Sequence, residues 1–169
     1  MLRRITARPI RIRVPALSNG VMTFSDLEKL RGQWTILCCI PSLDPMDAIF
    51  LDHQYEIFSQ YGAALVVLCR HDRLLLNSRI AQLRPLRIPI LADPLGRLSR
   101  AYSTSNPQGW FRCHISLLDH QLILQSQISH DLDIRSMDEI LELLAVLQER
   151  EHPEPNGYMH YTTPQLSRL

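Results

Sequence analysis

The sequence predicts an α/β fold in which helices cover both faces of a central β-sheet. Apolar runs rich in β-branched residues alternate with segments of helical periodicity, which is typical of parallel strands joined by helices. Near the end of the chain, two apolar runs are separated by a short turn, which predicts an antiparallel hairpin followed by one closing helix. The 169 residues suit one domain, and the 46% of apolar residues suffice for a buried core.

The first elements are predicted from alternation, capping and apolar content. Residues 10–14 alternate apolar and basic side chains, which predicts a short edge strand, and residues 18–20 form a turn. Ser25 is followed three residues later by Glu28, a spacing that predicts a capping box at the start of a helix. The continuous apolar run of residues 34–40 predicts a strand that is buried on both faces of the sheet.

The later elements continue the alternation of strand and helix. In chain order we expect a turn over 41–45, a helix over 46–61, a strand over 64–69, a helix over 72–84, a strand over 88–92, a helix over 96–103, hairpin strands over 109–119 and 122–129, and a helix over 138–150. Residues 1–150 are then one domain, and residues 151–169, with three prolines, are a tail. A terminal hairpin with one closing helix narrows the prediction to a thioredoxin-like fold with a mixed sheet.

Charge and cysteine usage limit the classes of partner and compartment. The net charge of +1 predicts neither a nucleic-acid nor an acidic-lipid partner, and no apolar stretch is long enough for a membrane span. The cysteines form no CxxC motif and no zinc-binding spacing, so we expect no metal and no other cofactor. Thiols within apolar runs indicate a reducing compartment and therefore a cytoplasmic protein. The four cysteines are Cys38, Cys39, Cys69 and Cys113.

Four stretches together resemble the peroxiredoxins, the alkyl hydroperoxide reductase and thiol-specific antioxidant family. Their order and spacing match that family over residues 14–147. The resemblance implies a thioredoxin-like fold of peroxiredoxin type, thiol peroxidase chemistry and a homodimer. The stretches are VPALSNGVMTFSDLEKLRGQWTILCCIP, YGAALVVLCRHD, IPILADPLGRLSRAYS and FRCHISLLDHQLIL.

The loop that carries the peroxidatic cysteine in that family departs from the pattern here. The family's loop reads proline, three residues, threonine or serine, two residues and cysteine. Counted from Pro41, the hydroxyl place falls on Pro45 and the cysteine place on Ala48. Counted back from Gly62 at the end of the helix, the cysteine place moves towards Asp44. Neither register offers a sulfur, so the sequence predicts a degenerate member of the family without the peroxidatic cysteine.

The family's active-site arginine is also displaced. It lies on the hairpin strand six residues before the turn aspartate, which is Asp119 here. That count reaches Cys113, with Arg112 one residue away, and a slip of one residue turns a strand side chain to the opposite face. Either a bulge brings Arg112 to the pocket, or Cys113 replaces it.

The sequence therefore leaves two functions open. The first is a peroxiredoxin-like protein without peroxidase activity, which acts as a module for protein binding or assembly, with Met46 and Phe50 closing the former pocket by apolar surface. The second is a thiol-dependent antioxidant oxidoreductase with a relocated cysteine. The candidates are Cys113 between the cationic side chains of Arg112 and His114, Cys69 near His71 and Asp72, and Cys39; for each of them, core packing is the alternative.

Overall fold

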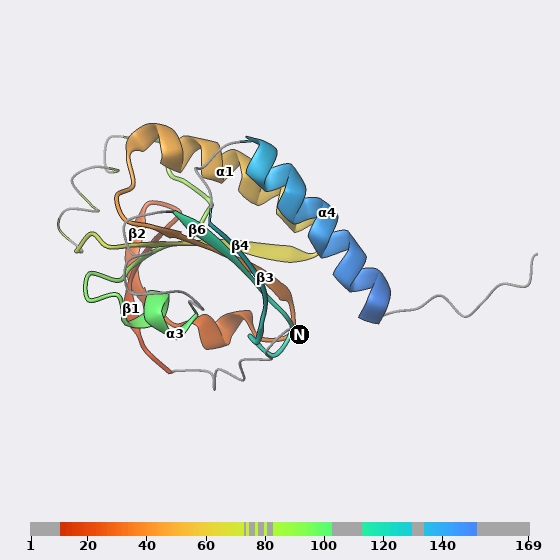
Figure 1. Cartoon of the computed structure of the whole chain (residues 1–169). Coiled ribbons are helices and arrows are strands. Elements are labelled where there is room, and N and C mark those ends of the chain that lie inside the picture. The colour runs from red at the N-terminus through yellow and green to blue at the C-terminus, as the bar shows by residue number, and fades with distance from the viewer. Residues whose placement is uncertain are drawn as a thin grey trace, which may run out of the picture.

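The protein is a single mixed β-sheet with helices on both faces, as the computed structural model shows (Figure 1). The structure describes residues 11–72, 83–102, 113–129 and 134–151, together with Leu74, Asn77 and Ile80. The seven-stranded sheet has the order β2-β1-β5-β4-β3-β6-β7. This arrangement confirms the predicted α/β class, a thioredoxin-like fold with a mixed sheet.

The elements have the following bounds. The strands are β1 (Val14–Ser18), β2 (Val21–Ser25), β3 (Trp34–Ile40), β4 (Ala63–Cys69), β5 (Ile90–Ala92), β6 (His114–Leu118) and β7 (Leu124–Ser129). The helices are the 3-10 helix η1 (Leu27–Leu30) and the α-helices α1 (Pro45–Gln60), α3 (Arg97–Ala101) and α4 (Ile134–Glu151).

The centre of the sheet is parallel and its flanks are antiparallel. β3 pairs with β4 in parallel along seven residues, and β4 pairs with β5 in parallel. β1 pairs antiparallel with both β2 and β5, and β6 pairs antiparallel with β3 and β7. Every residue of β3 is buried, which agrees with a continuous apolar run in a strand covered on both faces.

The two faces of the sheet carry separate apolar cores. One core joins alternate residues of β3, including Cys38, to α1 and α4. The other joins Leu37 and Cys39 to η1 and α3. Figure 1 shows α1 and α4 together on one face and α3 on the other. The adjacent cysteines therefore point to opposite faces, as strand alternation requires.

The prediction for the N-terminal region is wrong in two respects. The first strand is Val14–Ser18 rather than 10–14, and Val21–Ser25 is a strand that the sequence analysis did not predict. The turn between them is confirmed, with positive φ at Asn19 and Gly20, the backbone geometry of a tight hairpin. The predicted capping box is absent because Ser25 ends β2 and Asp26 takes the N-cap place of η1.

The other elements lie close to their predicted positions. The helix α1 and the strands β3, β4 and β5 are confirmed within two residues at each end. Leu74, Asn77 and Ile80 are helical, in agreement with the helix predicted over 72–84. α4 begins at Ile134, four residues before the predicted start. Residues 109–112 of the predicted hairpin and residues 152–169 of the tail lie outside the described residues.

Candidate functional site

The candidate site lies where β3 and β4 end and α1 begins. The last residues of the two parallel strands, Ile40 and Cys69, are paired in the ladder. Residues 41–44 connect β3 to the first residue of α1, Pro45. The carboxyl ends of parallel strands are the usual place for sites in α/β folds, so these loops are the place to look for chemistry.

The N-terminus of α1 is capped by the acidic side chain of Asp44. The Asp44 carboxylate accepts a hydrogen bond from the Asp47 backbone N–H at 2.8 Å, and the Asp44 carbonyl accepts one from the Ala48 N–H at 3.0 Å. Partial burial, together with repulsion from Asp44, raises the pKa of Asp47. The positive end of the helix thus already holds a carboxylate, where a peroxidase would need a thiolate.

The structure places the four candidate residues of the loop between β3 and α1 along this turn. Pro41 directly follows β3, Asp44 is the N-cap residue, and Pro45 is the first residue of the helix. Ala48 lies in the first turn with 0% exposure, and its methyl group belongs to the core between the sheet and α1.

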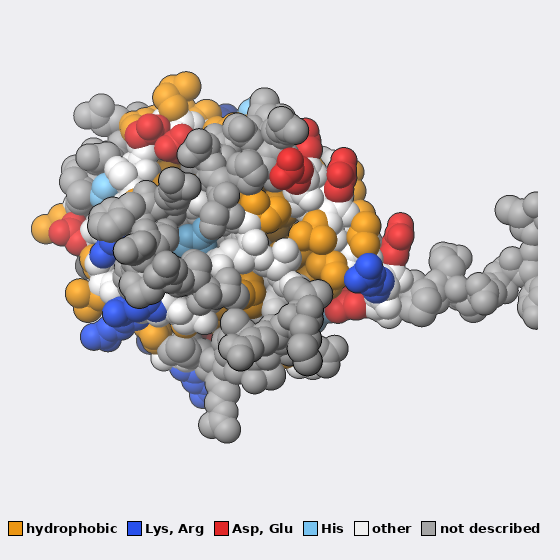
Figure 2. Space-filling view, in the orientation of Figure 1, with side chains coloured by type: hydrophobic (Ala, Val, Ile, Leu, Met, Phe, Trp, Pro, Cys, Tyr) orange, Lys and Arg blue, Asp and Glu red, His pale blue; other side chains and the backbone are white. Residues whose placement is uncertain are grey.

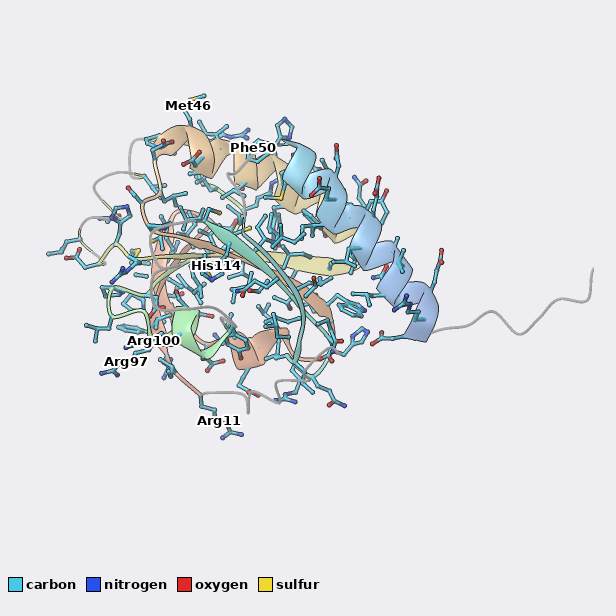
Figure 3. The ribbon with its side chains drawn as sticks, viewed as in Figure 1. Arg11, Met46, Phe50, Arg97, Arg100 and His114 are labelled. Atoms are coloured by element: carbon cyan, nitrogen blue, oxygen red, sulfur yellow. The ribbon has the colours of Figure 1, made fainter. Side chains whose placement is uncertain are left out.

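Two apolar side chains lie in the first two turns of the same helix. Met46 is 73% exposed, whereas Phe50 is partly buried against the core. Figure 3 shows Met46 at the outer end of α1 and Phe50 one turn further along. Phe50 therefore packs on the helix face beside the site, and Met46 extends the apolar surface into solvent.

His71 anchors the loop that leads into α1. Its Nε2 atom accepts a hydrogen bond from the Leu43 backbone N–H at 3.1 Å, and the Ser42 hydroxyl lies 3.5 Å from the same atom. Both His71 and Leu43 are buried, so this contact satisfies a backbone donor that water does not reach. The histidine lies two residues after the end of β4 and thereby ties the ends of β3 and β4 together.

We predict that His71→Leu lowers the free energy of unfolding by about 2 kcal/mol, because the buried Leu43 N–H loses its acceptor. His71→Gln, which keeps an acceptor on a side chain of similar reach, is expected to recover at least half of that loss. Urea denaturation of both variants measures the difference. Equal destabilisation by leucine and glutamine would show that the hydrogen bond is not what stabilises the loop.

Three of the four thiols are deeply buried. Burial is the main cause that raises the pKa of Cys38 and Cys39 far above that of an ordinary thiol. Burial likewise raises the pKa of Cys69 to about 11, although its thiol accepts a hydrogen bond from the His71 backbone. At neutral pH these groups are protonated and poor nucleophiles.

Cys113 differs from the other thiols in position and exposure. It is partly exposed, precedes β6 directly, and packs against the core that contains Ala48. It also lies close enough to Cys38 and Cys39 to influence their titration. Arg112 lies outside the described residues, so the choice between Arg112 and Cys113 in the pocket stays a prediction.

Three buried polar residues in or next to the site region were not identified as structural anchors from the sequence. They are His71, Asp52 on α1 and Asp93 after β5. Asp93 accepts hydrogen bonds from the backbone N–H groups of Arg97 and Ser99 and from the Ser99 hydroxyl, which fixes the start of α3. Their position in the sequence was the available signal: Asp93 directly follows the buried strand β5, and His71 lies two residues after the buried strand β4.

Within the described part of the chain, no helix combines the length and apolarity needed to cross a bilayer. The same residues contain no group of three His, Cys, Asp or Glu side chains arranged to hold a metal ion. The cytoplasmic location stays a prediction.

Comparison with known proteins relates the fold to one group of solved structures. No protein-family model matches the chain, and no curated protein gives a significant match. AhpC from Enterococcus faecalis superimposes with a TM-score of 0.74 at 17% identity, covering 90% of this chain and 98% of that chain. The reduced 2-Cys peroxiredoxin of Plasmodium vivax gives 0.70 at 19% identity, covering 83% and 93%. AhpC from Mycobacterium tuberculosis gives 0.68 at 18% identity, covering 86% and 93%. The chain thus has the peroxiredoxin type of thioredoxin-like fold.

Proposed function

We propose that this protein is a peroxiredoxin-fold module for protein binding or assembly that does not reduce peroxides. The observation that carries the proposal is the buried Ala48 in the first turn of α1, directly after the Asp44 cap. Peroxide reduction requires an attacking thiolate at the positive end of this helix. An alanine methyl group has no lone pair to attack with, and a carboxylate cannot pass through the thiol oxidation cycle.

The loop around Ala48 supports the same reading. Pro45 has no backbone N–H and no hydroxyl, so it cannot donate to a peroxide oxygen. The Asp47 N–H is already bonded to Asp44, and a second carboxylate in the turn disfavours additional negative charge. The donors and the positive potential that would stabilise a peroxide transition state are therefore used to cap the helix.

The surface suits a protein partner. Met46 is an exposed apolar side chain at the rim of the site, a residue type enriched at interfaces. Figure 2 shows acidic side chains along α4 and arginines on the opposite side of the view, where Figure 3 labels Arg97 and Arg100.

We expect the first such partner to be a second copy of the chain, as the fold resemblance implies. Sedimentation equilibrium should give twice the 19.5 kDa mass of the chain at micromolar concentration. A mass that stays at one chain over the whole concentration range would contradict the homodimer while leaving a different protein partner to be sought.

A second candidate function rests on Cys113. Its partial exposure on the face that contains Ala48, near Cys38, favours a relocated peroxidatic thiol. The Cys113 thiolate would attack the peroxide, break the O–O bond and become a sulfenic acid as one water leaves. An external thiol would then condense with it, releasing a second water and forming a mixed disulfide that a further external thiol reduces.

Peroxide consumption separates the two functions. We expect the purified protein with dithiothreitol to consume hydrogen peroxide no faster than its Cys113→Ser variant. Fast turnover that is abolished by Cys113→Ser would instead establish the oxidoreductase.

Iodoacetamide should modify Cys69 only as the pH approaches 11, because a raised pKa leaves about one thiolate in ten thousand at pH 7.

A further inference from the structure

The strand β2 forms one edge of the seven-stranded sheet, and its outer side is accessible to solvent. Within the described part of the chain, β2 pairs with β1 alone. Two of its apolar side chains are unusually exposed, Val21 at 58% and Phe24 at 53%. An accessible edge strand with apolar side chains is a surface to which another strand can add.

The ladder between β1 and β2 fixes which backbone groups of β2 point outwards. In an antiparallel pair, residues that exchange hydrogen bonds alternate with residues whose N–H and C=O groups point away from the partner strand. Pro15 has no N–H and lies opposite Phe24, so this pair is of the second kind. Met22 lies two residues before Phe24 and is of the same kind. The backbone groups of Met22 and Phe24 therefore face the free side of β2, whereas those of Thr23 face β1.

The free side of β2 lacks the features that usually protect a sheet edge. Such edges commonly carry a charged side chain, a proline or a bulge. The strand reads VMTFS, and its five residues pair with β1 in a continuous register. The strand β7 at the opposite edge differs, because its ladder with β6 contains a register shift. Among the described residues, no group bonds the outward backbone of Met22 or Phe24.

The pattern of outward groups on β2 is complementary to itself. When two β2 strands pair antiparallel about Thr23, Met22 of each strand lies opposite Phe24 of the other. Each of these two pairs can exchange both N–H···O=C bonds, and Thr23 falls on the position between them that makes none. Every other antiparallel register of these five residues pairs at most one outward residue with an outward residue. The strand is therefore matched to a second copy of itself in one register.

The side chains agree with the same pairing. No residue of β2 is charged, so no like charges face each other across the two-fold axis. Met22 is partly buried against the core of α1 and α4, and Phe24 points to the same face of the sheet. In the pair, each Phe24 ring lies beside Met22 of the other copy, which removes exposed apolar surface from water.

We propose that two copies of the chain associate through β2, antiparallel and centred on Thr23, so that their two seven-stranded sheets join into one continuous sheet. The proposal rests on the proposed role in assembly and names the surface that binds the second copy. Because the contact is built on strands of five residues, it belongs to the small class of interfaces, and we expect a micromolar dissociation constant.

Sedimentation equilibrium of Phe24→Pro tests the backbone pairing. Proline removes the outward N–H of residue 24 but no hydrogen bond of the ladder with β1, so each dimer loses two inter-chain hydrogen bonds. We expect the dissociation constant to rise about thirtyfold. Phe24→Leu keeps the N–H and an apolar side chain and should stay within about threefold of the wild type. An unchanged dissociation constant in Phe24→Pro, shown by circular dichroism to be folded, would overturn the β2 contact and place assembly at another surface.

Variants of Thr23 test the position of the two-fold axis, because residue 23 lies opposite residue 23 of the other copy. Thr23 is exposed in the single chain, so its substitution leaves the core intact. Thr23→Lys and Thr23→Asp should each weaken self-association about tenfold through like charges, and their equimolar mixture should associate at least as tightly as the wild type. A mixture that associates no better than either variant alone would exclude this register.

Hydrogen exchange at increasing protein concentration identifies the buried edge. The amides of Met22 and Phe24 should gain protection as the dimer forms, whereas the Thr23 amide, which already bonds to β1, should not change. Protection of the first two amides that does not depend on concentration would refute the proposal, because one chain would then cover its own edge. A wild type that stays monomeric up to about 1 mM would refute both this contact and the homodimer, while the peroxide assay separately tests the absence of peroxidase activity.

Discussion

Replacing Asp52 by alanine is expected to lower the free energy of unfolding by about 4 kcal/mol. Asp52 is buried on α1, and its Oδ1 atom accepts hydrogen bonds from the backbone N–H groups of Arg87 at 2.6 Å and Ile88 at 3.0 Å. Alanine removes the acceptor and leaves two backbone donors unsatisfied, each at a cost of about 1–3 kcal/mol. The change also removes the hydrogen bonds that hold the segment before β5 against α1.

Asp52→Asn is the matched control for this prediction. The amide oxygen can keep both backbone hydrogen bonds, while the charge opposite Arg84, at 3.6 Å, is lost. Because Arg84 is 66% exposed, that ion pair contributes less than about 1 kcal/mol. Urea denaturation should therefore separate the two variants by about 3 kcal/mol. Closely similar midpoints would mean that the backbone hydrogen bonds do not hold this segment.

Replacing Ala48 by cysteine is expected to raise the rate at which the protein consumes peroxide. The new sulfur would lie in the first turn of α1, where the helix dipole favours a thiolate. We expect peroxide consumption at least about tenfold above that of the wild type, measured with dithiothreitol as the reductant. Ala48→Ser, which adds a similar side chain without sulfur, serves as the control.

The acidic cap should limit the rate of that variant. Asp44 lies at the start of the same turn, and one nearby negative charge disfavours a second. Asp44→Ser keeps an N-cap oxygen and removes the charge, so the double variant with Ala48→Cys should react faster than the single variant by about tenfold. If both cysteine variants fold but neither consumes peroxide, a cysteine at position 48 is not sufficient for peroxide reduction in this loop.

The elements that the sequence predicted well have strong local signals. β3 and β4 are continuous apolar runs, and α1 follows turn residues and ends before Gly62. β2 was missed because it is an edge strand with exposed Val21 and Phe24, so its side chains show no clean alternation of apolar and polar residues. The first strand was predicted too early because residues 10–14 alternate apolar and basic side chains. The strand β1 instead begins at Val14, since its position is fixed by pairing with β2 and β5.

The sequence by itself determined the observation from which the proposed function starts: there is no cysteine between Cys39 and Cys69. It also determined the order of strands and helices from β3 onward, because hydrophobic periodicity is a local property of the chain. Only the tertiary structure decided that His71 holds Leu43 and that Asp52 holds residues 87 and 88. Those partners lie 28 to 36 residues apart, and a buried polar group finds its partner through packing that no local pattern records.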